Sequence, residues 1–438
     1  MCAVVCAGCS FKAPAGGGGP FDAAVDALVI PPGPCETVPQ STCSDADTLR
    51  ECKVQGANPV DTVCPLGCSI ANGAHCQTVV PAGGGASAMD LLPDAQLEQV
   101  TLSGTRTIIN GDTGEIAMGQ FTRDAGTGVI AGVDFHVANG IAVFRFKSLT
   151  IDGAVGLQGT HAIALVADGD IRVNTLVDAH GGCTNANDAK AGPGGFAGGG
   201  PKLVGSGDGG GAAAVGGAAD CSGGGGGGHG DTGGQGGKSG GPAGGANPAG
   251  GPPFGDAVIT LLVGGAGGGG GGGGGKATTG GGGGGAIQLV SNNTIRIDGT
   301  LDAGGCGGTG DGDGGSGGGA GGTILLEAAT VDVRGTLAVN GGAGGSSNIG
   351  PTRSPAGDAS TTAATAPSGG SNGAAGGDGG AAASSVGGPG GDGNQKGAGG
   401  GGAAGWIRLN GRSVTTNQGT ISPPIGSASS TQGMPKTQ

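Results

Sequence analysis

The chain has 438 residues, among them 117 glycines and 23 prolines, and its aromatic residues are 8 Phe and 1 Trp. Since conventional cores depend on large side chains, this composition excludes an ordinary large core and leaves room for narrow β-solenoids of Val, Ile, Leu and Ala. The net charge of −13 argues against a nucleic-acid partner, because nucleic-acid binding is dominated by cationic contacts to phosphate.

Residues 1–34 are interpreted as a truncated lipoprotein signal followed by a spacer. The run Cys6-Ala7-Gly8-Cys9 resembles the end of a bacterial lipobox, and this resemblance implies that Cys9 carries a lipid. The basic region of a full signal is missing, so we expect a start codon assigned too far downstream. The alternative is that these cysteines have no role and lie in a flexible terminus. Residues 13–34 are rich in Ala, Gly and Pro, which is typical of a spacer.

The lipobox resemblance also implies a location. Ser10 follows Cys9 where lipoproteins retained at the inner membrane carry Asp. We therefore expect a lipid-anchored protein at the bacterial outer-membrane surface, or an extracellular one. Membrane contact is expected only through the lipid anchor, because no apolar run reaches the length that spans a bilayer.

Residues 35–77 form a predicted module held by disulfides. It contains six cysteines, which are Cys35, Cys43, Cys52, Cys64, Cys68 and Cys76. An even number of cysteines in a segment too small for its own apolar core indicates disulfide bonds in an oxidising compartment, and the pairing stays open. A zinc site is the alternative, but the spacings around Cys64, Cys68 and His75 fit zinc ligands poorly.

Two parts of the chain resemble surface lipoproteins of myxobacterial type. The first is the Cys-rich run Leu49-Arg50-Glu51-Cys52 with Cys64-Pro65-Leu66-Gly67-Cys68 and His75-Cys76. The second is the later run from Ala286 to Gly305, which resembles the glycine-rich members of that group. The resemblance covers most of the chain and implies an envelope location. It assigns no activity and no catalytic residues.

Residues 78–96 are expected to be a linker, and residues 97–141 a β-rich cap. The cap is predicted from Asn110-Gly111 and Asn139-Gly140, because Asn-Gly is a strong hairpin signal. Terminal units of repeat proteins are expected to differ from the others, since an exposed apolar end invites aggregation.

Residues 142–438 are predicted to be all-β, in a parallel β-helix or solenoid. Short alternating strands recur there, and residues 162–179 align with 286–303 without a gap. Period-two alternation turns one face of each strand inward, so Ile and Val of successive coils are expected to stack. A β-sandwich is the alternative, and it requires hairpin signals between neighbouring strands.

Three glycine-rich insertions are predicted between the coils, at 181–285, 304–322 and 341–405. Disordered loops are one interpretation, because ordering glycine costs more backbone entropy than ordering any other residue. The other is a polyglycine II-like bundle of extended helices with three residues per turn, bonded only to their neighbours. The glycine content resembles that of bundle proteins among antifreeze proteins and phage-tip adhesins.

Two cysteines flank the start of the first insertion. A disulfide between Cys183 and Cys221 is expected, because it would close a long loop and restrict the disordered alternative. Cys306 is then either a third partner or a free thiol.

No catalytic, metal or cofactor site is predicted. The histidines fall in separate contexts, and His229, within polyglycine, is expected to be solvated. Paired carboxylates of a glycoside hydrolase are one interpretation of the acidic residues along the coils, which are Asp152, Asp170, Asp178, Asp298, Asp302 and Asp332. Ordinary turn chemistry explains aspartates at such corners as well. The run Gly310 to Gly315 does not match a calcium loop.

We therefore expect a non-enzymatic structural or adhesive protein of the bacterial envelope, at the cell surface or secreted. Its expected partners are extracellular polysaccharide or other surface proteins. A β-helical carbohydrate-binding or polysaccharide-degrading enzyme is the alternative, and ice binding by flat polyglycine faces is a third.

Overall fold

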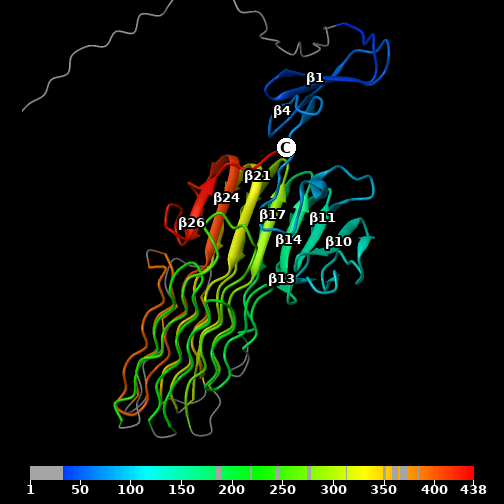
Figure 1. Ribbon diagram of the computed structural model, residues 1–438. Coiled ribbons are helices and arrows are strands. Elements are labelled where there is room, and N and C mark those ends of the chain that lie inside the picture. The colour runs from blue at the N-terminus through cyan, green and yellow to red at the C-terminus, as the bar shows by residue number, and fades with distance from the viewer. Residues whose placement is uncertain are drawn as a thin grey trace, which may run out of the picture. The chain divides into compact units, whose positions relative to one another are not determined.

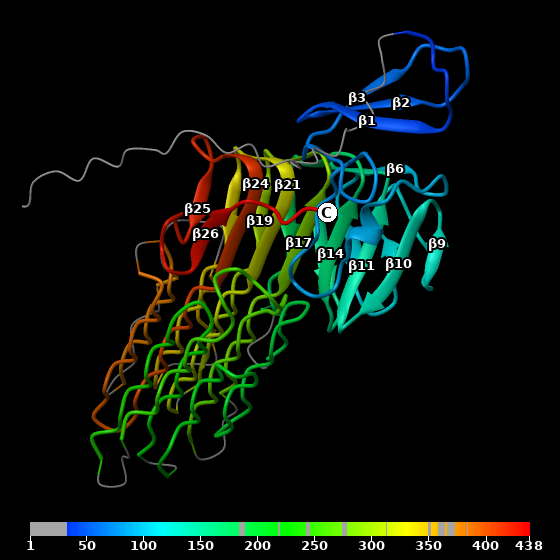
Figure 2. The same cartoon turned by 45° about the horizontal axis from the view of Figure 1, so that its top comes forward.

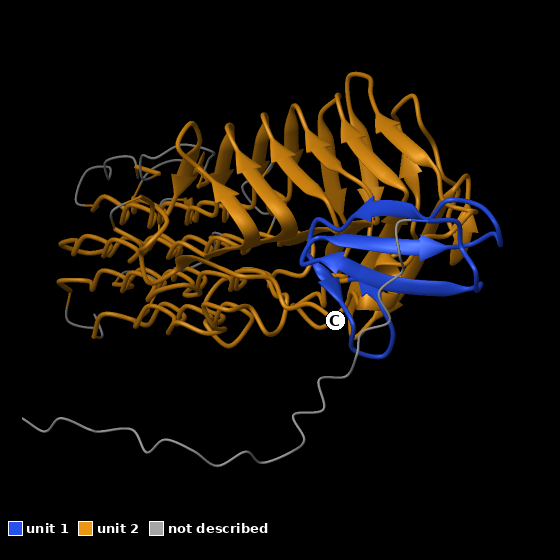
Figure 3. Ribbon diagram, turned by 90° about the horizontal axis from the view of Figure 1, so that it is seen from above, with its two compact units in different colours: residues 1–76 blue, residues 77–438 orange. Residues whose placement is uncertain are grey.

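The computed structural model describes residues 33–183, 189–217, 220–241, 246–273, 278–311, 313–348, 352–357, 364–365, 373–382 and 384–438. The chain divides into two compact units, residues 1–76 and 77–438 (Figure 3). Regular structure in the described residues is β throughout, apart from the short 3-10 helix η1 (Ala88–Leu91). This confirms the prediction of an all-β chain. The expected lipid carrier Cys9 lies outside the described residues.

The first unit is a small sheet held by disulfides. Strands β1 (Gln40–Asp45), β2 (Thr48–Cys52) and β3 (Val60–Val63) pair antiparallel, as do β4 (Cys68–Ser69) and β5 (His75–Cys76). The disulfides are Cys35–Cys52, Cys43–Cys68 and Cys64–Cys76. They confirm the predicted disulfide module and rule out the zinc alternative, because every cysteine of the module is bonded. Cys35 and Cys52 are its buried cluster, so disulfides replace the apolar core that a short segment lacks.

Most strands of the second unit belong to a 12-stranded and a 7-stranded sheet (Figures 1 and 2). Their parallel pairs form three stacks, of which stacks one and two lie in the 12-stranded sheet and stack three in the 7-stranded sheet. Stack one contains β11 (Ile141–Phe146), β14 (Ala162–Ala167), β17 (Ala286–Ser291) and the first parts of β21 (Thr323–Val333) and β24 (Trp406–Thr415). Stack two contains β6 (Gln99–Leu102), β12 (Ser148–Ile151), β15 (Ile171–Val173), β18 (Thr294–Ile297) and the last parts of β21 and β24. Stack three contains β7 (Thr107–Asn110), β13 (Val155–Gln158), β16 (Leu176–Asp178), β19 (Thr300–Asp302), β22 (Thr336–Ala338) and β25 (Thr420–Ser422).

Branched aliphatic side chains from all three stacks pack into one core. The register partners are Ile163, Ile287 and Ile324 in stack one, Ile171, Ile295 and Val331 in stack two, and Val177, Leu301 and Leu337 in stack three. All of them are buried in the same hydrophobic cluster. Residues 162–179 and 286–303, which align in sequence, thus pair residue for residue along their strands.

Hairpins close one end of the stacks. Strand β10 (Val133–Ala138) pairs antiparallel with β11 and with β9 (Gly128–Ile130), and β8 (Ile116–Ala117) pairs with β7. Asn139 and Gly140 join β10 to β11, and both have the positive φ that a tight hairpin turn requires. At the other end β26 (Ser430–Gly433) pairs with β24.

Residues 78–92 pack against the sheet of stack one. Val79 and Leu91 are completely buried, and the amide of Ala82 donates to the carboxylate of Glu327 on β21. Glu327 also accepts hydrogen bonds from Gln288 at 2.8 Å and from Asn410 at 3.0 Å. Burial raises the pKa of Glu327 in spite of these bonds. The segment is thus fastened to the sheet through polar as well as apolar contacts.

The described parts of the glycine tracts are hydrogen-bonded to one another and run side by side (Figures 1 and 2). Successive residues donate to different neighbouring segments, and each neighbour recurs at every third residue. In residues 223–228 the bonds are Gly223 to Gly237 and Gly226 to Gly234, Gly224 to Gly315 and Gly227 to Gly318, and Gly225 to Ala212 and Gly228 to Gly209. The short strands β20 (Thr309–Gly310) and β23 (Thr352–Arg353) lie among these tracts. The described residues of the tracts are therefore not free loops.

Glycine is required where these segments touch. A Cβ atom on Gly226 would overlap the carbonyl group of Gly401, and one on Gly317 would overlap that of Gly225. Backbones at such a separation leave no room for a side chain. Gly217 differs, because a Cβ atom there would face open space. Lateral contact between backbones, and not a left-handed φ, thus selects glycine at Gly226 and Gly317.

A disulfide joins the first two glycine tracts. It connects Cys183 to Cys306, so the predicted pair Cys183–Cys221 is wrong. Cys221 is a buried free thiol, with Sγ 3.1 Å from the carbonyl oxygen of Gly272. The physical reason is that Cys183 and Cys306 follow β16 and β19, which are neighbours in stack three, whereas Cys221 lies further along its tract. The four disulfides together indicate an extracellular or envelope location.

Candidate functional site: a polar groove on the third stack

The outer face of stack three carries a polar groove. Two adjoining cavities of about 410 and 540 Å³ share Arg106 and Gln158 in their linings and extend across β8, β7, β13 and β16. Ile108, Gly156 and Asp178 are register partners on these strands and therefore lie on the same face. Because Gly156 has no side chain, the guanidinium of Arg106 lies over it, with Nη2 3.4 Å from where a Cβ atom would be.

Asp112 forms one wall of this groove. Its Oδ1 accepts hydrogen bonds from the amide and the hydroxyl of Thr160 at 2.8 and 2.9 Å, and from Nδ1 of His161 at 2.8 Å. Burial alone would raise the pKa of Asp112, but these hydrogen bonds outweigh burial and lower it. The ionised carboxylate thus ties the turn after β7 to the corner between β13 and β14.

His180 forms the opposite wall and joins two of the predicted acidic residues. Its Nδ1 lies 3.0 Å from Oδ1 of Asp178, and its Nε2 lies 2.7 Å from the carbonyl oxygen of Gly357 and 3.6 Å from Oδ1 of Asp302. Burial alone would lower the pKa of His180, but the hydrogen bond to Asp178 and the charges of both carboxylates raise it to about 9. The ring is therefore an imidazolium that donates from both nitrogens.

This cluster fastens the third glycine tract to stack three. Asp302 is only 5% exposed and its charge is balanced by His180, so no substrate can reach that carboxylate for acid or base catalysis. The other predicted acidic residues lie apart. Asp152 accepts a hydrogen bond from Asn174, and Asp170, Asp298 and Asp332 pair with Arg172, Arg296 and Arg334. Of these six residues the structure brings together Asp178 and Asp302.

The His180 cluster predicts a loss of stability at alkaline pH. The pKa of His180 is 6.5 in a model peptide and about 9 in the folded chain, so the folded state binds the proton more tightly. The stabilisation is complete below pH 6.5 and is lost as the pH rises through 9, and it amounts to about 3 kcal/mol. Urea unfolding between pH 6 and 10 measures it. In His180→Gln the free energy of unfolding should no longer decrease over this alkaline range. A wild-type free energy of unfolding that stays constant from pH 6.5 to 9.5 contradicts the prediction.

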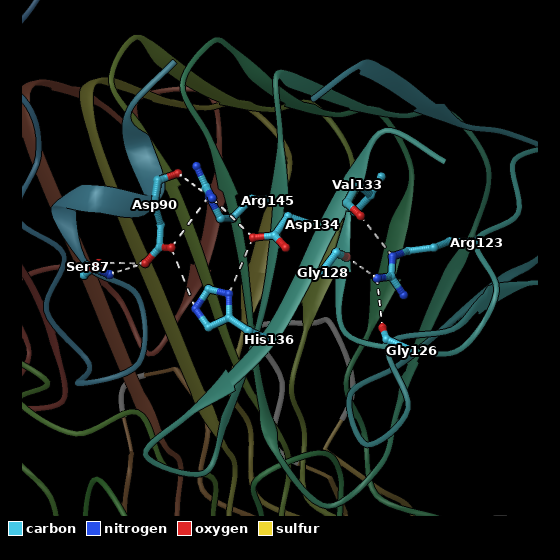
Figure 4. Close-up of polar contacts among 9 residues, drawn as sticks. All are labelled: Ser87, Asp90, Arg123, Gly126, Gly128, Val133, Asp134, His136 and Arg145. Atoms are coloured by element: carbon cyan, nitrogen blue, oxygen red, sulfur yellow. Dashed lines mark hydrogen bonds and ion pairs between the residues drawn. The ribbon is translucent and has the colours of Figure 1, made fainter. Parts of the chain in front are cut away.

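A second cluster of charges links β10, β11 and η1 (Figure 4). Nη1 of Arg145 donates to Asp134 at 3.2 Å, and its Nε donates to the carbonyl oxygen of Asp90 at 2.9 Å. His136 lies 3.7 Å from both carboxylates. The hydroxyl of Ser87 donates to Asp90, not to His136, so it is not activated as a nucleophile. The cluster holds η1 against the two strands.

His229 is completely buried among the glycine tracts, so the expectation of a solvated residue is wrong. Its ring centre lies 4.6 Å from that of Phe254 and 6.5 Å from that of Trp406. Nδ1 lies 2.8 Å from the carbonyl oxygen of Gly321, which can only accept, so Nδ1 carries the proton. Nε2 has no hydrogen-bond partner within the described residues. Burial lowers the pKa of His229 to about 4.

His229 predicts a loss of stability in acid. Because its pKa falls from 6.5 to about 4 on folding, the unfolded chain binds the proton first as the pH falls. The free energy of unfolding should decrease between pH 6.5 and 4 by about 3 kcal/mol. Fluorescence of Trp406, the single tryptophan, reports the unfolding. His229→Phe keeps an aromatic ring without a titrating nitrogen, so its free energy of unfolding should no longer decrease between pH 6.5 and 4. An unchanged decrease in that variant refutes the assignment to His229.

Among the described residues, no group of three or more His, Cys, Asp or Glu side chains is arranged to hold a metal ion. No helix in that part of the chain is long and apolar enough to cross a bilayer. Comparisons of the chain with protein-family models, with characterised proteins and with solved structures give no match. The resemblance to myxobacterial lipoproteins thus stays a prediction from the residues that carry it.

Sequence reasoning did not point to the residues that form the groove. Arg106 is distant in sequence from Gly156 and Gln158, and it meets them only because β7 and β13 pair in stack three. A partial signal is Arg106, which directly precedes the alternating strand Thr107–Asn110. Its position over Gly156 of the neighbouring strand depends on the register between β7 and β13, which the sequence around Arg106 does not indicate.

Proposed function

We propose that residues 142–438 form a parallel β-solenoid whose insertions pack as polyglycine II-type helices. Support for the solenoid comes from the chain path, which visits stacks one, two and three and then enters stack one again beside its previous strand. Support for the helices comes from the three-residue recurrence of hydrogen-bond partners, which equals the residues per turn of an extended helix without internal bonds. Slow amide exchange in the glycine tracts would be the signature of this bundle.

The function that this architecture supports best is that of a non-enzymatic structural or adhesive protein of the bacterial cell surface, or a secreted one. The observation that carries the proposal is that glycine segments from three separate insertions are hydrogen-bonded to one another and pack with their backbones in contact. A charged group at the end of stack three also stabilises the packed glycine segments, because His180 is hydrogen-bonded to the carbonyl oxygen of Gly357 in the third insertion. Attachment through a lipid on Cys9 and kinship with myxobacterial surface lipoproteins belong to the same proposal.

An attachment assay tests the adhesive function. Beads coated with the full chain should be retained by bacterial cells or by a film of extracellular polysaccharide, whereas beads coated with albumin should not. Gly226→Ala disturbs the glycine packing and should abolish retention, while Gly217→Ala, at an open position, should keep it. Coated beads that bind neither cells, nor polysaccharide, nor one another contradict the proposal.

A further inference from the structure

The groove on stack three contains a guanidinium that no described carboxylate contacts directly. Arg106 makes no hydrogen bond or ion pair with any of the described residues and lies in the lining that both cavities share. Its guanidinium rests over Gly156, beside Ile108, whose Cδ1 would be 3.1 Å from a Cβ atom at Gly156. The floor of the groove is thus shallow at this point, and the five donors of the guanidinium are open to a ligand.

Two of the acidic residues that line the groove already have donors. Asp112 is occupied by Thr160 and His161, and Asp178 is occupied by His180. They therefore do not compete for Arg106 by direct contact, although both line the larger cavity. Glu115 lies in the smaller cavity, away from these two residues. Within the described residues the guanidinium therefore makes no direct contact with a carboxylate, although its charge acts on Asp178 from a distance and Glu115 lines the smaller cavity with it.

Uncharged amides extend the polar lining on either side of Arg106. Gln158 lines both cavities, and Asn110 lines the smaller one with its Nδ2 free, because its Oδ1 accepts from the amide of Asp112 at 2.9 Å. The groove crosses β8, β7, β13 and β16, a length of about 14 Å at the usual spacing of strands. A ligand that fits is elongated, carries many hydroxyl groups and places an acidic group at Arg106.

We propose that this groove binds a carboxylated polysaccharide, with a uronate carboxylate on the guanidinium of Arg106 and sugar hydroxyls on the amides of Gln158 and Asn110. The proposal rests on the proposed adhesive function and gives it a site and a ligand class. Guanidinium and carboxylate match in a planar, bidentate geometry, which favours carboxylate over a neutral sugar. The groove offers one guanidinium free of direct contacts within the described residues, and the chain has a net charge of −13, which disfavours nucleic acid because its binding requires several cationic contacts.

Calorimetric titration of the full chain with oligogalacturonate in low salt tests the proposal. Saturable binding is expected, and it should weaken at least tenfold in Arg106→Gln and in Gly156→Val, whose side chain fills the floor under the guanidinium. Arg172→Gln is the matched control, since Arg172 is an exposed arginine on stack two, and its affinity should stay within twofold of the wild type. Neutral dextran oligomers should not bind.

Other outcomes overturn the proposal. Absence of saturable oligogalacturonate binding, or equal affinity of Arg106→Gln and the wild type, removes the groove as the site. Equally tight binding of polyglutamate assigns the groove to an acidic peptide and refutes the saccharide. Failure of the proposed function is distinguishable, because beads that do not attach while the chain binds oligogalacturonate reject adhesion and leave the groove assignment intact.

Discussion

Replacing Gly226 by alanine should destabilise the second unit by about 3 kcal/mol or more, because the added methyl group overpacks a site that cannot relax. The Cβ atom would overlap the carbonyl group of Gly401, and Gly226 is fixed in place by a hydrogen bond from its amide to Gly234 and another from Gly251 to its carbonyl. Displacing it therefore disturbs three neighbouring segments at once. Urea unfolding followed by Trp406 fluorescence measures the effect, since Trp406 lies beside His229 near the end of the same segment.

Gly217→Ala is the control for this substitution. A Cβ atom at Gly217 meets nothing within 4 Å, and its φ is not in the left-handed region, so the change should stay within about 0.5 kcal/mol of the wild type. Any small effect should be stabilising, because alanine restricts the unfolded chain more than glycine does. Equal unfolding midpoints for Gly226→Ala and Gly217→Ala would show that the tracts are not packed as described.

Removing the side chain of Arg123 should destabilise the hairpin end of the stacks by about 4 kcal/mol, because buried carbonyl groups lose a charged donor. Arg123 is 1% exposed and donates to the carbonyl oxygens of Gly114, Asp124, Gly126, Gly128 and Val133. Figure 4 shows three of these contacts, those to Gly126, Gly128 and Val133. Its guanidinium carbon also lies 5.5 Å from the ring centre of Phe135. Burial lowers the pKa of Arg123, yet the group remains charged because arginine loses its proton only in strong alkali.

The measurement is the urea midpoint together with amide exchange over residues 114–133, which should accelerate first in Arg123→Ala. Arg123→Lys separates charge from geometry. Lysine keeps the positive charge but has three donors on one atom, so it should recover less than half of the loss. Arg172→Ala, at an exposed arginine on stack two, should change little. Full recovery of stability in Arg123→Lys would mean that the positive charge alone stabilises these turns, and not the hydrogen bonds from the guanidinium to the five carbonyl oxygens.

The β strands were predictable because their signal is local. Alternation in Val143-Phe144-Arg145-Phe146 and the gap-free match of 162–179 with 286–303 reflect the one face of each strand that enters the shared core, and the same residues pair in the structure. In stack one the other face is buried as well, which the alternation did not indicate. The hairpin at Asn139-Gly140 was equally local, since these residues accept positive φ. The disulfide module followed from cysteine density in a segment without an apolar core.

The errors concern residues whose neighbours come from distant parts of the chain. Cys183 was expected to pair with Cys221 in the same tract, but the strand register places Cys306 beside it. His229 was expected to be solvated because polyglycine surrounds it in sequence, whereas Phe254 and Trp406 enclose it in space. Neither partner is visible in a local pattern, because packing between insertions decides it.

The sequence by itself determined the residue types that this protein can use: small branched side chains for stacked strands, cysteines for a coreless module and glycine wherever backbones touch. The tertiary structure decided which segments meet. It thereby decided the contact of His180 with Gly357, the hydrogen bonds of Arg123 to surrounding carbonyl groups and the groove around Arg106. The physical reason is range. Alternation and turn chemistry act between residues that are neighbours in the chain, whereas strand register and lateral hydrogen bonds between glycine tracts join residues that only folding brings together.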